Sequence, residues 1–240
     1  MRSPHAALVA ALLVVPCVVP AQDASDSAAY RALTQTPSAA LPSPFDVGIT
    51  GEAPRGVGVR VRYGIMSFDT HEYTHDFGVG VEIPIGRASL SLTGGYYWPN
   101  CTDSACHSHV MAGVGLSQSL VAIPLGQSDD RGSFTVGLLT EAGFARPGDT
   151  TLVAGEASLP LGLVPSKRNL RFVPYVSPGV GVGLVRDGSG TEAGLQFTFN
   201  AGVGLLTAGG FAANVGISRV FLSGGNWLVG VGLAFGGGPR

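Results

Sequence analysis

The residues that could do chemistry most directly in this 240-residue chain are its histidines. Residues 71–75 read HEYTH, which matches the zinc-protease motif His-Glu-x-x-His. That motif works on a helix, which places both histidines and the glutamate beside one metal ion. Here residues 71–75 lie between two strand-like stretches and show no helical period, so a zinc protease is not expected.

A looser metal site remains open at the same place. Every histidine beyond residue 21 lies in or beside two successive segments between strands, and carboxylates accompany them. Imidazole and carboxylate groups suit zinc or copper, and the alternative is a solvated polar rim. We expect no cofactor unless zinc binds here. The four candidate ligands are His71, His75, His107 and His109.

Five charged residues form a second candidate site, because they alternate with the large apolar side chains of their strands. They are Arg60, Arg62, Glu82, Glu141 and Glu156. Charges inside a closed fold must be paired or hydrated. A water-filled channel is one alternative, and acid–base catalysis by the two close carboxylates Glu141 and Glu156 is another. We expect a network in which both arginines pair with Glu82 and reach toward the other glutamates. Such a network would close the interior of the fold.

Two cysteines remain beyond the first 21 residues, Cys101 and Cys106. An even pair in an exported chain indicates a disulfide. No Ser/His/Asp arrangement, nucleophilic cysteine or cofactor fingerprint stands out. The Gly-Val-Gly repeats alternate inside strands, whereas a phosphate-binding loop lies between a strand and a helix. The chain is therefore not expected to be an enzyme.

The composition narrows the class of protein. Charged residues make up 12% of the chain and the net charge is −2, which excludes a polybasic nucleic-acid binder. Thirty-seven glycines together with 45% hydrophobic residues are unusual for a soluble domain. No window holds the 18 consecutive apolar residues of a membrane-spanning helix. Two folds fit: a soluble sandwich with its apolar faces inside, or a closed barrel with them outside.

The chain divides into three segments. Residues 1–21 have a basic start, a short apolar core and a small-residue cleavage site, which indicates a signal peptide. Residues 22–54 are rich in Ala, Ser, Pro and Asp, and they are interpreted as a flexible periplasmic leader. Residues 55–240 form the third segment, which alternates between apolar and small or polar residues.

The alternation in the third segment has a period of two, which indicates β-strands. It predicts an all-β fold of about ten strands, with eight as the smaller possibility. The phase of the fourth strand breaks near residues 117–120, which suggests a β-bulge. The expected strands are approximately 57–65, 77–85, 89–98, 109–125, 134–144, 153–161, 172–185, 195–205, 211–218 and 227–235.

The last strand, Trp227–Phe235, has large apolar residues at its odd positions and an aromatic residue at each end. With the signal peptide and the run of hairpins, it resembles the small bacterial outer-membrane β-barrel proteins over about residues 55–236. The resemblance implies a transmembrane antiparallel up-and-down β-barrel, with aromatic residues at both membrane interfaces. The expected interface aromatics are Tyr63, Tyr96, Trp98, Phe134, Phe144, Trp227 and Phe235.

The resemblance further implies residence in the outer membrane and contact with lipid and lipopolysaccharide. It implies assembly by the machinery that reads a final aromatic residue, here Phe235. No family active site can be transferred. The favoured function is a monomeric structural or narrow-pore barrel. The alternatives are a metal- or ligand-binding surface protein that uses the first two external loops and, less favoured, an outer-membrane hydrolase.

Overall fold

The computed structural model describes most of the chain beyond residue 55. The described ranges are 56–67, 73–100, 108–126, 132–165, 170–188, 190–207, 210–220 and 227–236. The predicted signal peptide (1–21) and leader (22–54) lie outside them. In the ranges just given, no helix is long and apolar enough to span a bilayer.

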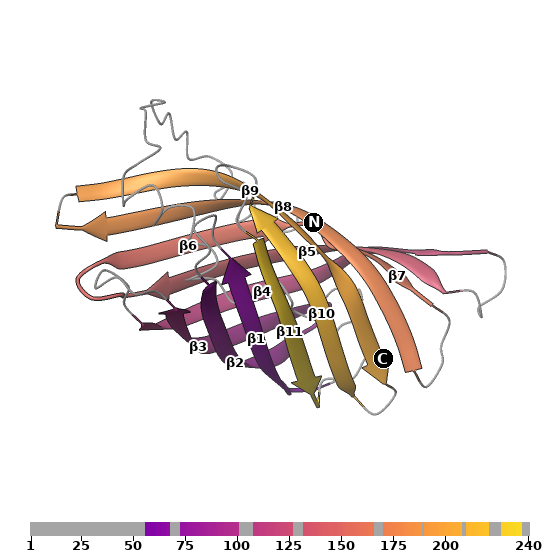
Figure 1. The fold of residues 1–240 in the computed structure, drawn as a ribbon. Coiled ribbons are helices and arrows are strands. Elements are labelled where there is room, and N and C mark those ends of the chain that lie inside the picture. The colour runs from indigo at the N-terminus through magenta and orange to yellow at the C-terminus, as the bar shows by residue number, and fades with distance from the viewer. Residues whose placement is uncertain are drawn as a thin grey trace.

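The regular elements of these ranges are all β-strands (Figure 1). In chain order they are β1 (Gly58–Ser67), β2 (Tyr73–Ile85), β3 (Ala88–Asn100), β4 (His109–Pro124), β5 (Ser133–Ala145), β6 (Thr151–Ser158), β7 (Leu161–Val164), β8 (Leu170–Asp187), β9 (Gly190–Thr207), β10 (Phe211–Val220) and β11 (Trp227–Phe235).

The strands form one closed antiparallel barrel. Neighbours follow the order β4-β3-β2-β1-β11-β10-β9-β8-β6-β5-β7, and further pairings of β4 with β5 and of β8 with β7 complete the ring. Because β6 and β7 both lie between β5 and β8, they occupy a single position. The barrel therefore has the ten positions that the alternation predicts, and the predicted fold class is confirmed.

Two irregularities interrupt the strands. The register between β4 and β5 shifts between Ser119 and Val121, where the phase break predicts a bulge. The sixth predicted strand is wrong as a continuous element, because it divides into β6 and β7 at Leu159 and Pro160. Proline has no N–H to donate to a neighbouring strand. Its carbonyl still accepts a 2.8 Å hydrogen bond from the amide of Gly137.

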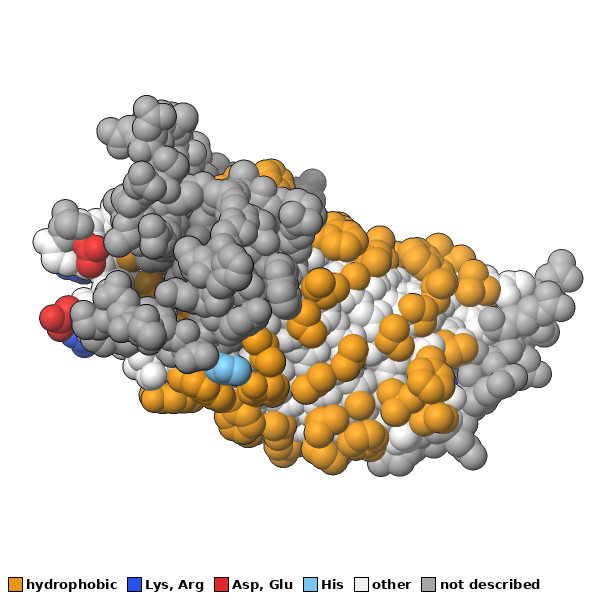
Figure 2. Space-filling view, viewed as in Figure 1, with side chains coloured by type: hydrophobic (Ala, Val, Ile, Leu, Met, Phe, Trp, Pro, Cys, Tyr) orange, Lys and Arg blue, Asp and Glu red, His pale blue; other side chains and the backbone are white. Residues whose placement is uncertain are grey.

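The exterior of the barrel carries the large apolar side chains. Figure 2 shows hydrophobic side chains spread over the wall that faces the viewer. Outward residues near the middle of strands remain substantially exposed, such as Val79 (44%), Val215 (55%) and Val231 (43%). The alternate positions point into the lumen and are mostly glycine or polar residues, so the barrel is apolar outside and polar inside.

One part of the lumen is apolar. Val164, Val173, Leu206 and Ala212 form a buried cluster, and Ala234 packs against it. These residues lie on β7 to β11, toward the end of the barrel where β11 finishes. Ala234 pairs with the first lumen arginine of β1, so the apolar cluster borders the charged region directly.

Candidate functional site

The first group of lumen charges joins β1, β2, β3 and β4. Arg60 forms an ion pair with Glu82, and Glu82 also accepts a hydrogen bond from the Ser89 hydroxyl. The Ser89 and Ser117 hydroxyl oxygens lie 2.7 Å apart. A continuous polar chain therefore crosses four strands on the inner face, and it contains the Arg60–Glu82 pair that the sequence predicts.

Arg62 has a different partner from the one expected. Its Nε lies 3.5 Å from Asp76 Oδ1, and its Nη2 lies 3.5 Å from the sulfur of Met111 on β4. The side chain lies over Gly78, where a Cβ atom would overlap it. Met111 likewise lies over Gly95, where a Cβ would come within 2.7 Å of its Cε. The two glycines thus provide the space in which this contact forms.

The sequence predicts strand β2 only from residue 77, which leaves Asp76 in a loop and its ion pair unpredicted. Strand β2 begins at Tyr73, and Asp76 is already an inward position of that strand. It is only 2% exposed. The alternation of side chains along the strand could have revealed that Asp76 points inward, because it is an even number of residues from the inward Gly78 and Glu82.

The second group of charges lies on β5 and β6. Glu141 and Glu156 are direct cross-strand partners. Glu156 accepts hydrogen bonds from the Thr198 hydroxyl at 2.8 Å and from the Asn200 side chain. Glu141 is buried, interacts electrostatically with Glu156, Arg62 and Arg60, and its Oε1 has no hydrogen-bond partner. Neither glutamate forms an ion pair within the described part of the chain.

Two aromatic residues of the lumen were not singled out from the sequence. The Tyr175 hydroxyl donates a 3.2 Å hydrogen bond to Asn214 Oδ1. To reach β10, the ring crosses β9 at Gly202, where a Cβ would come within 2.6 Å of the tyrosine oxygen. Tyr97 stacks on His109 with ring centroids 4.6 Å apart. Bulky residues facing glycines are the sequence signal that could have identified the Tyr175 contact.

The histidines do not converge as a metal site in the described residues. His75 points outward, where its Nδ1 lies 2.8 Å from the Tyr63 hydroxyl and its ring stacks on Trp98. His109 is buried and points into the lumen. The two side chains therefore lie on opposite faces of the wall. His71 and His107 fall outside the described ranges, within which no group of three or more His, Cys, Asp or Glu residues could hold a metal ion.

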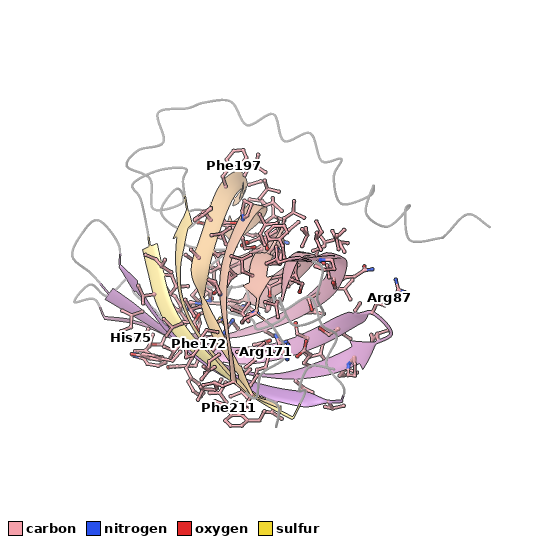
Figure 3. All side chains as sticks on the ribbon, turned by 90° about the vertical axis from the view of Figure 1, so that its right-hand side faces the viewer. His75, Arg87, Arg171, Phe172, Phe197 and Phe211 are labelled. Carbon is pink, nitrogen blue, oxygen red and sulfur yellow. The ribbon has the colours of Figure 1, made fainter. Side chains whose placement is uncertain are left out.

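The outward aromatic residues gather toward the two ends of the barrel. Tyr63, His75, Trp98 and Tyr96 form a stacked group on β1 to β3, with successive ring centroids 5.4 to 6.0 Å apart. At the opposite end, Phe211 packs against Phe235 at 5.3 Å. Figure 3 shows His75 and Phe211 at the outer margin of the barrel.

The remaining predicted interface and disulfide residues divide into two sets. Phe144 is exposed on β5, and Phe134 is partly exposed near the other end of the same strand. The side chain of Trp227 is not among those described, and Cys101 and Cys106 lie outside the described ranges. The disulfide between the two cysteines therefore stays a prediction.

Comparison with known proteins finds likeness of fold only. No family model and no curated protein matches the chain. Among solved structures, the outer membrane enzyme PagL is 14% identical, with a TM-score of 0.39 over 73% of this chain and 98% of that chain. The β domain of the Bordetella autotransporter BrkA is 11% identical, with a TM-score of 0.41 over 75% and 98%. Ail of Yersinia pestis is 12% identical, with a TM-score of 0.23 over 77% and 99%.

The antiparallel barrel predicted from the sequence is confirmed by the strand pairings themselves. At such low identity, no residue role or activity of these proteins is transferred to this chain. The chemistry that the described residues can perform is electrostatic. They hold two ion pairs and two unpaired glutamates inside a wall whose outer surface is apolar.

Proposed function

We propose that this chain is an integral outer-membrane β-barrel with a structural role, and that the charges in its lumen close it to ions. The observation that carries the proposal is the contrast between the two faces of the wall. Large apolar side chains cover the outside, whereas ion pairs and hydrogen-bonded side chains occupy the inside. This contrast inverts the arrangement of a soluble protein.

The exterior supports residence in a bilayer. Monomeric soluble proteins rarely expose large continuous apolar patches, yet here almost every strand contributes outward Val, Leu, Ile or Phe. A tilted strand needs about 9–11 residues to cross the hydrocarbon core. Strands β1, β10 and β11 contain 10, 10 and 9 residues, respectively. A closed barrel also leaves no unpaired backbone edge in the lipid.

The two ion pairs support closure of the lumen. Arg60–Glu82 and Arg62–Asp76 lie on the inner face of adjacent strands, and three of these four residues, Arg62, Asp76 and Glu82, are buried. Breaking a buried ion pair by removing one partner costs about 3–5 kcal/mol. An ion that passes through must therefore displace well-held charges and then pass the apolar cluster that begins beside Arg60.

Single-channel recording in planar bilayers tests the proposal on the refolded full chain. The wild-type barrel should show no steady conductance, whereas Arg60→Ser/Arg62→Ser should show current steps. Asp187→Asn, a change at the exposed last residue of β8, serves as the control and should stay closed. Steady conductance of the wild type would reject closure and favour a narrow pore. Release of the protein from outer membranes by an alkaline wash would reject membrane residence itself.

The absence of an enzymatic activity stays a prediction, as do contacts with lipopolysaccharide and the assembly machinery and the monomeric state. Among the described lumen residues, no paired nucleophile and base supports the hydrolase alternative. The surface metal site depends on His71 and His107, so zinc titration must decide it.

A further inference from the structure

Three buried oxygen atoms on one part of the lumen wall have no hydrogen-bond partner. They are Ser158 Oγ, Ser177 Oγ and Asn200 Oδ1, and their residues are 2%, 4% and 2% exposed. Native structures leave very few buried polar atoms without a partner, and an ordered water or an ion is the common explanation for those that remain. Three such atoms together therefore indicate that something polar belongs beside them.

The strand register brings these oxygens together. Ser177 on β8 pairs with Asn200 on β9, and Ser158 on β6 pairs with Gly179, the next inward position of β8. A Cβ at Gly179 would come within 2.8 Å of the Ser158 Cβ and 2.6 Å of the Thr198 hydroxyl. The Ser158 and Thr198 side chains thus approach each other over Gly179, which has no side chain of its own.

Negative charge lies at the same place. Glu156, the next inward residue of β6 after Ser158, accepts a hydrogen bond from the Asn200 amide, which leaves Asn200 Oδ1 close to the carboxylate. Glu141 is the cross-strand partner of Glu156, and its Oε1 is also without a hydrogen-bond partner. Neither carboxylate forms an ion pair in the described chain, and Arg60 and Arg62 act on Glu141 only at longer range.

The wall beside this region carries small inward residues. The inward positions one step closer to the β5–β6 and β8–β9 turns are Gly143, Ala154 and Gly183, which pair in one row. Gly181 lies opposite Glu156. Small residues therefore line the approach along three strands.

We propose that the lumen binds a hard divalent cation of the calcium class on the β6–β8–β9 wall. The Glu156 carboxylate and Asn200 Oδ1 are its main protein ligands, the Ser158 and Ser177 hydroxyls and water complete the shell, and Glu141 supplies the second negative charge. Calcium takes six to eight oxygen ligands in flexible geometry, including carboxylates, side-chain carbonyls and water. Softer metals prefer imidazole or thiolate, and neither group occurs among these residues.

This site depends on the barrel fold but not on closure of the lumen. Calorimetric titration with Ca²⁺ on the refolded full chain, in detergent free of lipopolysaccharide, measures it separately from conductance. Wild type should bind one equivalent in a saturable manner. Glu156→Gln should lose binding, and Glu141→Gln should weaken it about ten- to a hundredfold. The control Asp149→Asn removes an exposed carboxylate between β5 and β6 and should bind as wild type does.

A second measurement covers variants that fold poorly. Ser158→Ala/Ser177→Ala removes only two hydroxyls and should bind Ca²⁺ more weakly while remaining folded. The melting temperature of wild type should rise with Ca²⁺, because a ligand that binds only the folded state stabilises it, and that of Glu156→Gln should not. No saturable binding by wild type, or equal binding by wild type and Glu156→Gln, would overturn the proposal. A barrel that binds Ca²⁺ and also conducts would overturn only the closure.

Discussion

Gly78 provides a sharp test of the lumen, because the Arg62 side chain lies where its Cβ would be. A Cβ at this position would overlap the Nε of Arg62 and lie 3.0 Å from both Cδ and Cγ. These atoms belong to the middle of the side chain, so Arg62 must move as a whole. The change Gly78→Ala is therefore expected to shift the guanidinium away from Asp76 and Met111.

The expected cost follows from three contributions. Overpacking a filled site costs about 1–3 kcal/mol. If Arg62 leaves Asp76 without a partner, the loss rises to about 3–5 kcal/mol. Because Gly78 does not have a positive φ, alanine also recovers about 0.4–1 kcal/mol by restricting the unfolded chain. The free energy of unfolding should therefore fall by about 0–2.5 kcal/mol if the ion pair survives and by about 2–4.5 kcal/mol if it is lost.

Urea unfolding of the barrel in phospholipid vesicles, followed by fluorescence of the two tryptophans, measures this change. Gly94→Ala is the matched control. It lies on the outer face of β3, and a Cβ there meets no atom within 4 Å. It should be neutral or slightly stabilising.

A double-mutant cycle shows whether the cost of Gly78→Ala comes from the Arg62 side chain or from any side chain at this position. In an Arg62→Ala background, the side chain that blocks the Cβ is absent, so Gly78→Ala should no longer destabilise the barrel. If Gly78→Ala is as stable as Gly94→Ala, or if its cost is unchanged without Arg62, the assignment of the Arg62 contact is wrong.

Three further predictions concern the exterior and the loops. Val231→Arg, in the middle of β11, should cost about 2–4 kcal/mol in vesicle unfolding, whereas Val59→Arg near the end of β1 should cost about 0–1 kcal/mol; equal costs would argue against a lipid-facing wall. Thiol labelling of the native, non-reduced chain should find no free cysteine beyond residue 21, and reduction should cost about 2 kcal/mol because the loop is short; two reactive thiols would exclude the disulfide. Zinc titration should distinguish wild type from His71→Ala/His75→Ala if the surface site exists, and identical curves would remove it.

The period-two alternation was sufficient to predict the barrel, because each strand has one lipid-like face and one small or polar face. It also located the β4 bulge, since a bulge changes the phase of the side chains within one strand. The ion pair between Arg60 and Glu82 followed from the same logic, as both are inward residues at similar depth on adjacent hairpin strands.

The remaining contacts depend on strand ends and register, which short stretches of sequence do not determine. Asp76 became a lumen residue only because β2 extends beyond the predicted start. His75 and His109 both lie near loops, which groups them in the sequence. Side chains alternate along each strand, however, so His75 points outward and His109 points inward. The proposed cation site joins β6, β8 and β9, and its residues come together only once the β8–β9 register is known.

The pairing of β1 with β11 has a consequence for how the barrel assembles. Apart from the position shared by β6 and β7, every other strand pairs with its neighbour in sequence, so most of the wall is built from local hairpins. The seam instead joins Val59 to Phe235, almost the full length of the described chain. Contacts of such high sequence separation form slowly, because a long loop must close first.

Until this seam forms, both of its strands present unpaired N–H and C=O groups. Such edges attract other strands in water and are very unfavourable in hydrocarbon. Closure and entry into the bilayer must therefore occur together. A change that weakens only the β1–β11 seam should leave the hairpins intact yet produce an open sheet that aggregates before it inserts.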